Sequence, residues 1–324
     1  MKGQPRVFPE SNGNIEKEFL AAWRAEFGIE IDAYRRFVDA VENRAIERQE
    51  PVAQMRRSEL IALAESPEVG LKIVENLSLV PRPSWRQLPD GYDSKDIAFW
   101  RFRRRLSVLR RPLLQLTTAN DDPPILFAPG LLREGFVFTF AQYYDASYPD
   151  WHLGPAMKRY SGYARNRDGM QFNREVADQM TELGWQACPE VTITKILGKA
   201  LERNYGDVDV LAWDAKGGRV LVMECKDLQF RKTYGEIAEQ LSDFRGEMSA
   251  DGKRRDLLRK HLDRVEVLRS HVPQVKKYLG LNGDCSIESH IVFKHPVPMQ
   301  FSEGPIRQQA TLHIFADLHK LSLA

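Results

Sequence analysis

Two apolar runs separated by a short, glycine-containing segment constrain the fold of this chain most strongly. The first run spans residues 207–213, the second spans residues 220–226, and the segment Asp214-Ala215-Lys216-Gly217-Gly218 lies between them. Runs of this length that are rich in Val and bounded by Gly and Asp are typical of β-strands joined by a tight turn. The sequence therefore predicts a β-hairpin in the C-terminal half.

Alternation of side chains along each strand decides which residues of this hairpin meet. Glu224 and Lys226 share one face of the second strand, because they are two residues apart. If residue 214 pairs with residue 219 across a four-residue loop, the antiparallel register places Asp209 directly opposite Glu224, with β-carbons roughly 4.5–5.5 Å apart. A loop that is longer or shorter by one residue breaks this alignment.

Two carboxylates opposed in this way have a predictable chemistry. They repel each other, and in a region of low dielectric constant one of them takes up a proton unless a cation lies between them. Mg²⁺ suits such oxygen ligands, because it keeps several waters and accepts the phosphate oxygens of a substrate. Lys226 would hold or deprotonate a water whose pKa the ion lowers. This arrangement indicates hydrolysis of a phosphodiester.

The triplet Glu224-Cys225-Lys226 differs from the other acid-x-Lys triplets of the sequence. Residues 93–95, 214–216 and 251–253 also match, but each of these lies close to a Gly in a predicted turn or loop. Only Glu224-Cys225-Lys226 ends an apolar run and faces another acid. The alternative is a surface Glu–Lys pair on an edge strand, although charged residues rarely end such a run without a function.

The N-terminal half is predicted to be helical at first and rich in β-strands later. Apolar residues recur at helical spacing in residues 15–27 and 33–41, and Ser58 begins a third helical segment that ends at Ser66-Pro67. After a connector rich in Pro, short apolar runs predict a small sheet built from residues 113–116, 125–128 and 136–140. The segment Asn166-Arg167-Asp168-Gly169 is the predicted boundary, which gives ranges of 1–167 and 168–324.

The C-terminal half shows a clearer succession of elements. Asp168 is a predicted N-cap for a helix that ends at Gly184, Thr233 begins a second helix, and a long basic helix follows Asp251. Strands are predicted at residues 191–194, 207–213, 220–226, 289–293 and 311–315. The order is helix, three strands, helix and further strands.

Asp209 followed by Glu224-Cys225-Lys226 resembles the PD-(D/E)XK nuclease superfamily, and is most similar to its Mrr-type and RecB-like branches. The order of predicted elements matches the core of that superfamily. The resemblance covers residues 168–324. It implies an α/β, restriction-endonuclease-like fold with a mixed central sheet flanked by helices, preceded here by a helical N-terminal region with a small sheet.

The resemblance also implies roles for the residues of the hairpin. Asp209, Glu224 and the backbone carbonyl of Cys225 would hold Mg²⁺, for which Mn²⁺ can substitute, and Lys226 would position the attacking water. Asp207 is the alternative first acid, because a Gly-acid pair commonly precedes the first ligand in this superfamily. Only Asp209, however, meets Glu224 in the predicted register.

Two further residues are implied by the resemblance alone. Glu175 stands where many members carry an assisting acid on the first helix, and Gln240 stands where RecB-like members carry Gln on the helix after the Lys strand. Each has a plainer alternative. Glu175 can be a residue at the solvent edge of its helix, and Gln240 can be an ordinary helix former.

Basic residues are concentrated in two runs, although the formal net charge is only +2. A local basic stripe matters more than total charge when the partner is a phosphate backbone. The alternative is that both runs are solvated faces of amphipathic segments. The residues of these runs that are candidates for nucleic-acid contact are Arg101, Arg103, Arg104, Arg105, Lys253, Arg254 and Arg255.

These features predict a metal-dependent nuclease, most simply a DNA endonuclease in restriction, phage defence or repair, because the resembling branches mostly cut DNA. The alternatives are a structure-selective or RNA-directed nuclease of the same fold, and a non-catalytic nucleic-acid-binding or scaffold protein. Nucleic acid is the expected partner, with a homodimer or a larger defence complex as the expected assembly.

The sequence also predicts where the protein acts. No apolar run is long enough to span a bilayer, and the N-terminus has no apolar region typical of a secretory signal. The three cysteines show neither metal-ligand spacing nor a disulfide framework. We therefore expect a cytoplasmic protein without a membrane partner.

Overall fold

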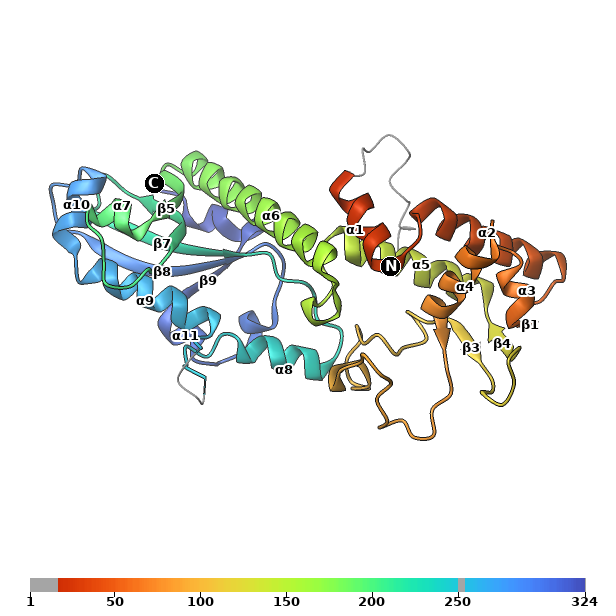
Figure 1. The fold of residues 1–324 in the computed structure, drawn as a ribbon. Coiled ribbons are helices and arrows are strands. Elements are labelled where there is room, and N and C mark those ends of the chain that lie inside the picture. The colour runs from red at the N-terminus through yellow and green to blue at the C-terminus, as the bar shows by residue number, and fades with distance from the viewer. Residues whose placement is uncertain (1–16, 250–253, 324) are drawn as a thin grey trace. The chain divides into compact units, whose positions relative to one another are not determined.

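A computed structural model describes residues 17–249 and 254–323, and Figure 1 shows its helices and strands. The chain divides between Arg165 and Asn166 into two compact units, which we call unit 1 and unit 2. Each unit contains helices and one β-sheet, so the protein belongs to the mixed α/β class. The separate roles that the sequence assigned to residues 1–167 and 168–324 stay predictions.

The described residues of unit 1 combine helices, including the first part of a helix that continues into unit 2, with a small sheet. The α-helices that lie wholly within it are α1 (Lys17–Phe27), α2 (Ile31–Glu47), α3 (Arg57–Ile61), α4 (Pro67–Leu77) and α5 (Pro129–Tyr144). The sheet has the order β1-β4-β3-β2, from β1 (Ala53–Arg56), β2 (Ser78–Leu79), β3 (Leu113–Gln115) and β4 (Pro124–Phe127). Aromatic residues from α1 and α5 lie in the core, where Phe19 and Phe140 meet edge to face.

A long irregular segment connects β2 to β3 in unit 1. Within residues 80–112 the only regular element is a 3-10 turn, η1 (Ser94–Asp96), and a second such turn, η2 (Asp150–His152), follows α5. The fully buried carboxylate of Asp96 holds these parts together: it pairs with Arg105 at 2.6 Å and lies 3.2 Å from the His152 imidazole. Burial lowers the pKa of His152 to about 4 despite the neighbouring Asp96 carboxylate, so this imidazole is neutral at pH 7.

Helix α6 (Pro155–Glu182) is continuous through the predicted boundary at residues 166–169. The prediction that Asp168 caps the start of this helix is therefore wrong. Asp168 lies inside the helix and pairs with Arg167 on its surface. An Asp followed by a Gln three residues later resembles a capping box, but the residues before it also favour a helix, and helix formation is cooperative.

Unit 2 is built around a five-stranded sheet with the order β5-β6-β7-β8-β9. Its strands are β5 (Gln186–Thr192), β6 (Asp207–Trp213), β7 (Arg219–Lys226), β8 (Ser286–Phe293) and β9 (Thr311–Ile314). Strands β5, β6 and β7 pair antiparallel, whereas β7, β8 and β9 pair parallel. A mixed sheet of this kind needs helices on its faces, because the parallel strands are joined by crossover connections.

Two apolar clusters show which helices cover each face of this sheet. On one face, Met223 and Cys225 of β7 pack with Phe172 and Met180 of α6. On the other face, Val222 belongs to a separate cluster. That cluster includes residues of α7 (Ile193–Leu197), α9 (Leu257–Arg269) and α10 (Val272–Leu279). The remaining elements of unit 2 are α8 (Tyr234–Ser242), η3 (Pro298–Phe301), α11 (Ile306–Gln309) and η4 (Phe315–Leu321).

The hairpin between β6 and β7 has the predicted register. Val210 pairs with Met223 and Trp213 with Val220, and the Asp214 amide donates to the Arg219 carbonyl at 2.9 Å. This pairing leaves a four-residue turn, residues 215–218. Strands β8 and β9 are also confirmed near their predicted positions.

One predicted strand is wrong, and a second, residues 191–194, is a strand only at Val191 and Thr192. Residues 136–140 lie within α5, because the aromatic residues there pack against other helices and not in a sheet. Ile193 and Thr194 begin α7 and do not extend β5, since the Thr192 hydroxyl accepts a bond from the Lys195 amide and caps that helix. The small sheet instead gains β1 and β2, which are too short to have a clear pattern.

Gly218 should be essential to the turn that sets the register of the hairpin. Its φ is +68°, and an added Cβ would lie 1.9 Å from the backbone oxygen of Asp284. Gly198 is a matched control, because its φ is +65° but no atom lies within 4 Å of an added Cβ. We expect Gly198→Ala to cost about 1–2 kcal/mol from the left-handed backbone alone.

Gly218→Ala should cost about 1–3 kcal/mol more than the control, because the backbone around Asp284 must move. The measurement is the free energy of unfolding in urea for both variants. Equal losses of stability would show that the turn tolerates the displacement.

Candidate active site

The β6–β7 hairpin brings the three predicted catalytic residues together on one face of the sheet. The Lys226 ammonium lies 2.6 Å from Glu224 Oε1 and 3.8 Å from Asp209 Oδ2. Continuing the observed register places Asp209 opposite Glu224. The side chain of Cys225 packs on the other face, with Met223 and Phe172. The prediction that Asp209, Glu224 and Lys226 meet on a face that excludes the Cys225 thiol is confirmed.

Asp209 is fixed by the neighbouring strand and not by a close cation. Its Oδ2 accepts a hydrogen bond from the backbone N–H of Cys225 at 2.8 Å. This contact orients the carboxylate toward the end of β7, where Glu224 and Lys226 lie. Asp207, the alternative acid, is exposed at the start of β6, and therefore does not enter the cluster.

Helix α9 contributes two residues that the sequence did not assign to the site. The Arg264 guanidinium donates from Nη1 to Glu224 Oε2 and from Nε to the Tyr205 carbonyl at 3.1 Å. The His261 ring lies 3.8 Å from the same Glu224 oxygen, and its Nε2 bonds to the Ser289 hydroxyl at 3.0 Å. The sequence did contain one sign that His261 is buried: it lies on the apolar face of this helix, where a polar residue is unusual.

The pKa values of the two acids move in opposite directions. Burial and, to a lesser extent, the negative charge of Glu224 together raise the pKa of Asp209 to about 6. Burial also opposes ionisation of Glu224, but the cations Lys226 and Arg264 outweigh it and lower the pKa of Glu224 to about 2. At neutral pH the site therefore holds two ionised carboxylates, one of them poorly compensated.

The basic groups of the site differ in protonation. Burial acts to lower the pKa of Lys226, but the carboxylates of Glu224 and Asp209 outweigh it and raise the pKa, so the ammonium keeps its proton. Burial lowers the pKa of His261 to about 4, so its ring is neutral at pH 7. Positive charge next to Glu224 thus comes from Lys226 and Arg264.

The donor set of the site fits a magnesium ion better than a transition metal. In the part of the chain that the structure describes, no three or more His, Cys, Asp and Glu side chains are grouped to hold a metal. Asp209 and Glu224 offer two carboxylates, which is the number that Mg²⁺ sites commonly use, with waters and substrate oxygens completing the octahedron. The poorly compensated charge of Asp209 is the feature that a divalent cation would relieve.

Glu175 and Gln240 are not joined to this cluster by a recorded contact. Glu175 lies on α6, the helix that covers the opposite face, and its carboxylate accepts a bond from Gln171 at 3.1 Å. Gln240 is buried in α8, where its Nε2 donates to the Gln229 carbonyl at 3.4 Å and its Oε1 has no hydrogen-bond partner among the described residues. The catalytic roles of both stay predictions.

The basic residues chosen as nucleic-acid contacts fall into several environments. In unit 2, Arg255 pairs with Asp263 at 3.2 Å, Arg254 is exposed, and Lys253 lies outside the described residues. In unit 1, Arg105 is held by the buried Asp96, and Arg103 donates to the Ser147 carbonyl. Arg104 donates to the carbonyls of Phe99 and Arg101, and Arg101 itself lies against two tryptophan rings.

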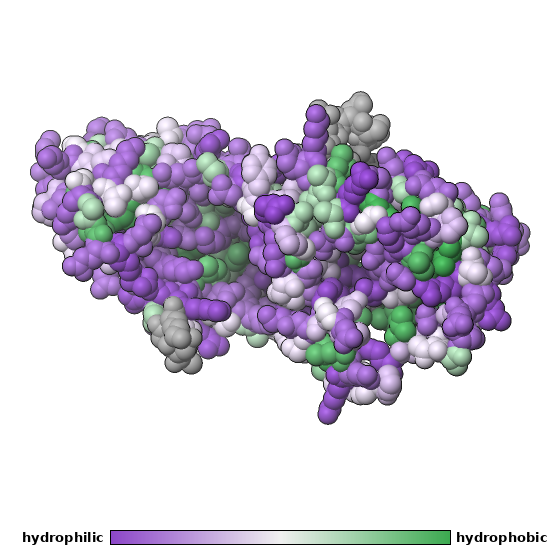
Figure 2. Space-filling view, in the orientation of Figure 1, coloured by the Kyte–Doolittle hydropathy of each residue, from purple (hydrophilic) through white to green (hydrophobic). Residues whose placement is uncertain are grey.

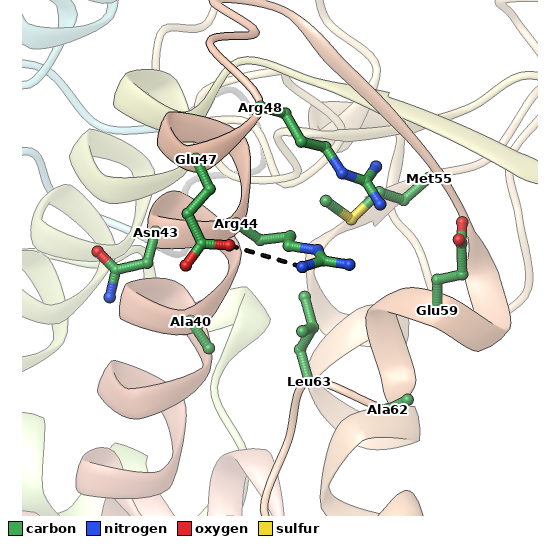
Figure 3. A pocket seen from close by; sticks show the side chains of 9 residues that line it. All are labelled: Ala40, Asn43, Arg44, Glu47, Arg48, Met55, Glu59, Ala62 and Leu63. Carbon is green, nitrogen blue, oxygen red and sulfur yellow. Dashed lines mark ion pairs between the residues drawn. The ribbon is translucent and has the colours of Figure 1, made fainter.

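A cavity of about 450 Å³ in unit 1 contains none of these residues (Figure 3). It lies between α2 and the β1–α3 segment, and Met55 and Leu63 form part of its apolar lining. Its Arg44 pairs with Glu47 at 3.5 Å, and Glu59 accepts a bond from the Arg56 amide. Both acids that line the cavity, Glu47 and Glu59, therefore already have partners, and they do not face each other as Asp209 and Glu224 do.

Comparison with known proteins places the chain in a family. A family model described as anti-phage protein Upx-like matches residues 4–318, which is nearly the whole sequence. The chain belongs to this Upx-like family of anti-phage proteins. No curated protein and no solved structure matches it significantly. Within the described residues no helix is both long enough and apolar enough to cross a membrane.

The raised pKa of Asp209 predicts a pH-dependent loss of stability in metal-free protein. A carboxyl whose pKa is higher in the folded state than in the unfolded state destabilises the fold as the pH rises through that interval. For Asp209 the interval runs from the ordinary pKa of an aspartate, 3.8, to a pKa of about 6 in the folded protein. Asp209→Asn removes the charge but keeps an oxygen that can accept from the Cys225 amide.

We therefore expect Asp209→Asn to raise the melting temperature in EDTA at pH 8 and to change it little at pH 4. Asp207→Asn changes an exposed position on the same strand and is the control. Its effect on the melting temperature should be small at both pH values. A lower melting temperature for Asp209→Asn at pH 8 would mean that Asp209 forms a stabilising ion pair.

Proposed function

We propose that unit 2 is a divalent-metal-dependent nuclease of the restriction-endonuclease-like type, which contributes to anti-phage defence by cleaving nucleic acid. The observation that carries this proposal is the convergence of Asp209, Glu224 and Lys226 at the end of one hairpin. The mixed five-stranded sheet with helices on both faces agrees with the element order that the sequence resemblance implies.

The residues of the site have distinct tasks in this proposal. Asp209 and Glu224, with the Cys225 carbonyl, would hold Mg²⁺, which would supply Lewis-acid stabilisation of the charge on the scissile phosphate. The Lys226 ammonium, fixed by Glu224 at 2.6 Å, orients the attacking water by donating a hydrogen bond to it. Arg264 holds the second oxygen of Glu224 and so positions that carboxylate. DNA is the proposed substrate, because the branches that the sequence resembles mostly cut DNA.

A scaffold without activity is the second candidate, and the ion pairs of Glu224 favour it. Both oxygens of this carboxylate already have a cationic partner, Lys226 and Arg264, as in a purely structural network. Asp209 argues against this candidate, because its nearest cation is 3.8 Å away while its pKa is raised. A structural network gains little from a second, partly buried acid whose nearest cation is 3.8 Å away.

The proposal predicts that the full chain nicks or degrades plasmid DNA with Mg²⁺ or Mn²⁺, and that EDTA stops the reaction. Lys226→Ala should lower the rate at least about 100-fold, as removal of a preorganised charged donor does in other enzymes. Lys226→Arg keeps a cation beside Glu224 but changes its geometry, so it should retain the fold and still lose most activity.

Lys216→Ala is the matched control, because Asp214-Ala215-Lys216 has the same acid-x-Lys pattern in the exposed turn of the same hairpin. It should cleave at the wild-type rate. If Lys226→Arg, folded by circular dichroism, also cleaves at that rate, then the site does not carry the reaction.

A further inference from the structure

The irregular segment of unit 1 combines positive charge with exposed aromatic rings. Residues 80–111 contain nine Arg and Lys against three Asp, together with Trp85, Tyr92, Phe99, Trp100 and Phe102. Apolar patches lie among hydrophilic side chains along the lower part of unit 1 in the space-filling view (Figure 2), where Figure 1 shows this segment. Large aromatic residues left exposed together mark interaction surfaces more often than single exposed residues do.

Several arginines of the segment hold it in shape. Arg105 pairs with the buried Asp96 and lies 4.2 Å from the centre of the Tyr92 ring. Arg110 is buried against the Tyr148 ring, and Arg111 donates to the carbonyls of Glu75 and Ser78. These contacts give a segment without helices or strands a defined conformation, so the rings on its surface are presented in fixed positions.

The two exposed tryptophan rings each lie next to a cation. Trp85 is 58% exposed, has Arg86 at 5.0 Å from its centre, and meets Phe99, which is 74% exposed. Trp151, in η2, is 41% exposed and has the Lys95 ammonium 4.4 Å from its centre. Arg101, the neighbour of Trp100, lies 5.4 Å from the same Trp151 ring. The result is a surface on which aromatic faces and positive charges alternate.

A cavity of about 370 Å³ lies in the same segment. Its walls include Val80, Pro83, Leu88 and Leu106, and Arg82 is at its rim with Arg111. Ser78 also lines it, and its hydroxyl is buried without a hydrogen-bond partner among the described residues. A cavity of this size, with apolar walls and a few polar groups, is within the range of small-ligand sites.

We propose that this segment of unit 1 binds unpaired nucleotides, with bases stacked on Trp85, Phe99 and Trp151, one base inserted in the cavity, and phosphates beside the adjacent cations. Proteins that bind single strands use this combination, because every base has an aromatic face and every linkage a negative charge. In a duplex the base faces are hidden against each other, so the exposed rings would have nothing to stack on. We call these residues the stacking surface.

This proposal goes beyond the proposed nuclease activity, because it assigns a second nucleic-acid site and a preference for unpaired substrate. It rests on the proposed function only for its biological purpose, which is to direct the hairpin site to single-stranded or frayed nucleic acid. Binding by the stacking surface does not require Asp209, Glu224 or Lys226, so the two proposals can fail separately.

The test measures binding by the full-length Lys226→Arg protein in EDTA, so that cleavage does not contribute. The probes are fluorescein-labelled oligo(dT), oligo(U), a blunt duplex of equal length, and an abasic oligodeoxynucleotide with the same number of phosphates. We expect both single strands to bind at least about tenfold more tightly than the abasic strand, since a single stacked base already contributes on that order. The ratio of oligo(dT) to oligo(U) then shows whether the unpaired strand is DNA or RNA.

Trp85→Ala and Trp151→Ala should each lower the affinity for both single strands by about tenfold, the contribution of one stacked base, while leaving the weak, salt-sensitive binding of the abasic strand in place. Both rings are exposed, so the variants should keep the wild-type melting temperature. Ile46→Ala, an exposed apolar position of the same unit, is the control and should bind like the parent. Equal affinity for the oligo(dT) and abasic strands, tighter binding of the duplex, or unchanged affinity in both Trp variants would overturn the proposal. Absence of plasmid cleavage by the wild-type protein with Mg²⁺, while the stacking surface still binds single strands, would instead count against the nuclease alone.

Discussion

The pairing of β6 with β7 determines the chemistry that unit 2 can perform. A strand alternates its side chains between two faces, so a shift of one residue would move Asp209 away from Glu224 and toward the α6 side of the sheet. The four-residue turn prevents that shift, and a contact between the Ser286 amide and the Gly218 carbonyl at 2.9 Å ties the turn to β8. The functional proposal depends on this register more than on any single side chain.

Once the register is fixed, the site has a charge balance that is unusual for a folded interior. Glu224 is compensated by two cations, whereas Asp209 has only a backbone amide and a more distant ammonium. Buried acids with unequal compensation are more common at functional sites than elsewhere, because the unfavourable charge is relieved only when a ligand binds. Membership of an anti-phage family gives such a site a biological setting, and cleavage of nucleic acid is one chemistry that fits both.

The hairpin and the three residues of the site could be predicted from the sequence because the signals there are local. The turn residues fix the loop length, and the period of two then determines which residues share a face. The same reasoning failed at residues 136–140, where Phe and Val fit a strand as well as a buried helix, and packing between helices decided the outcome. It also failed at Asp168, where a good capping pattern lies inside a longer helix.

Arg264 and His261 could not be assigned to the site from the sequence, because a contact between α9 and β7 depends on the tertiary fold. Arg264 was visible only as one member of a basic run, and its bond to Glu224 bridges residues 40 positions apart. In the other basic run, the sequence could not separate arginines that hold the loop, such as Arg105, from cations that lie beside exposed rings, such as Arg86.

The central claim is that Asp209 and Glu224 together form a site for a divalent ion, and a crystal soaked in Mn²⁺ tests it most directly. Anomalous scattering locates the ion without reference to activity. The account predicts one strong peak within about 2.0–2.4 Å of an oxygen of each carboxylate, as expected for oxygen ligands of such ions. The claim would be contradicted if, at saturating Mn²⁺, no anomalous peak lies at the hairpin and Glu224 keeps its bonds to Lys226 and Arg264.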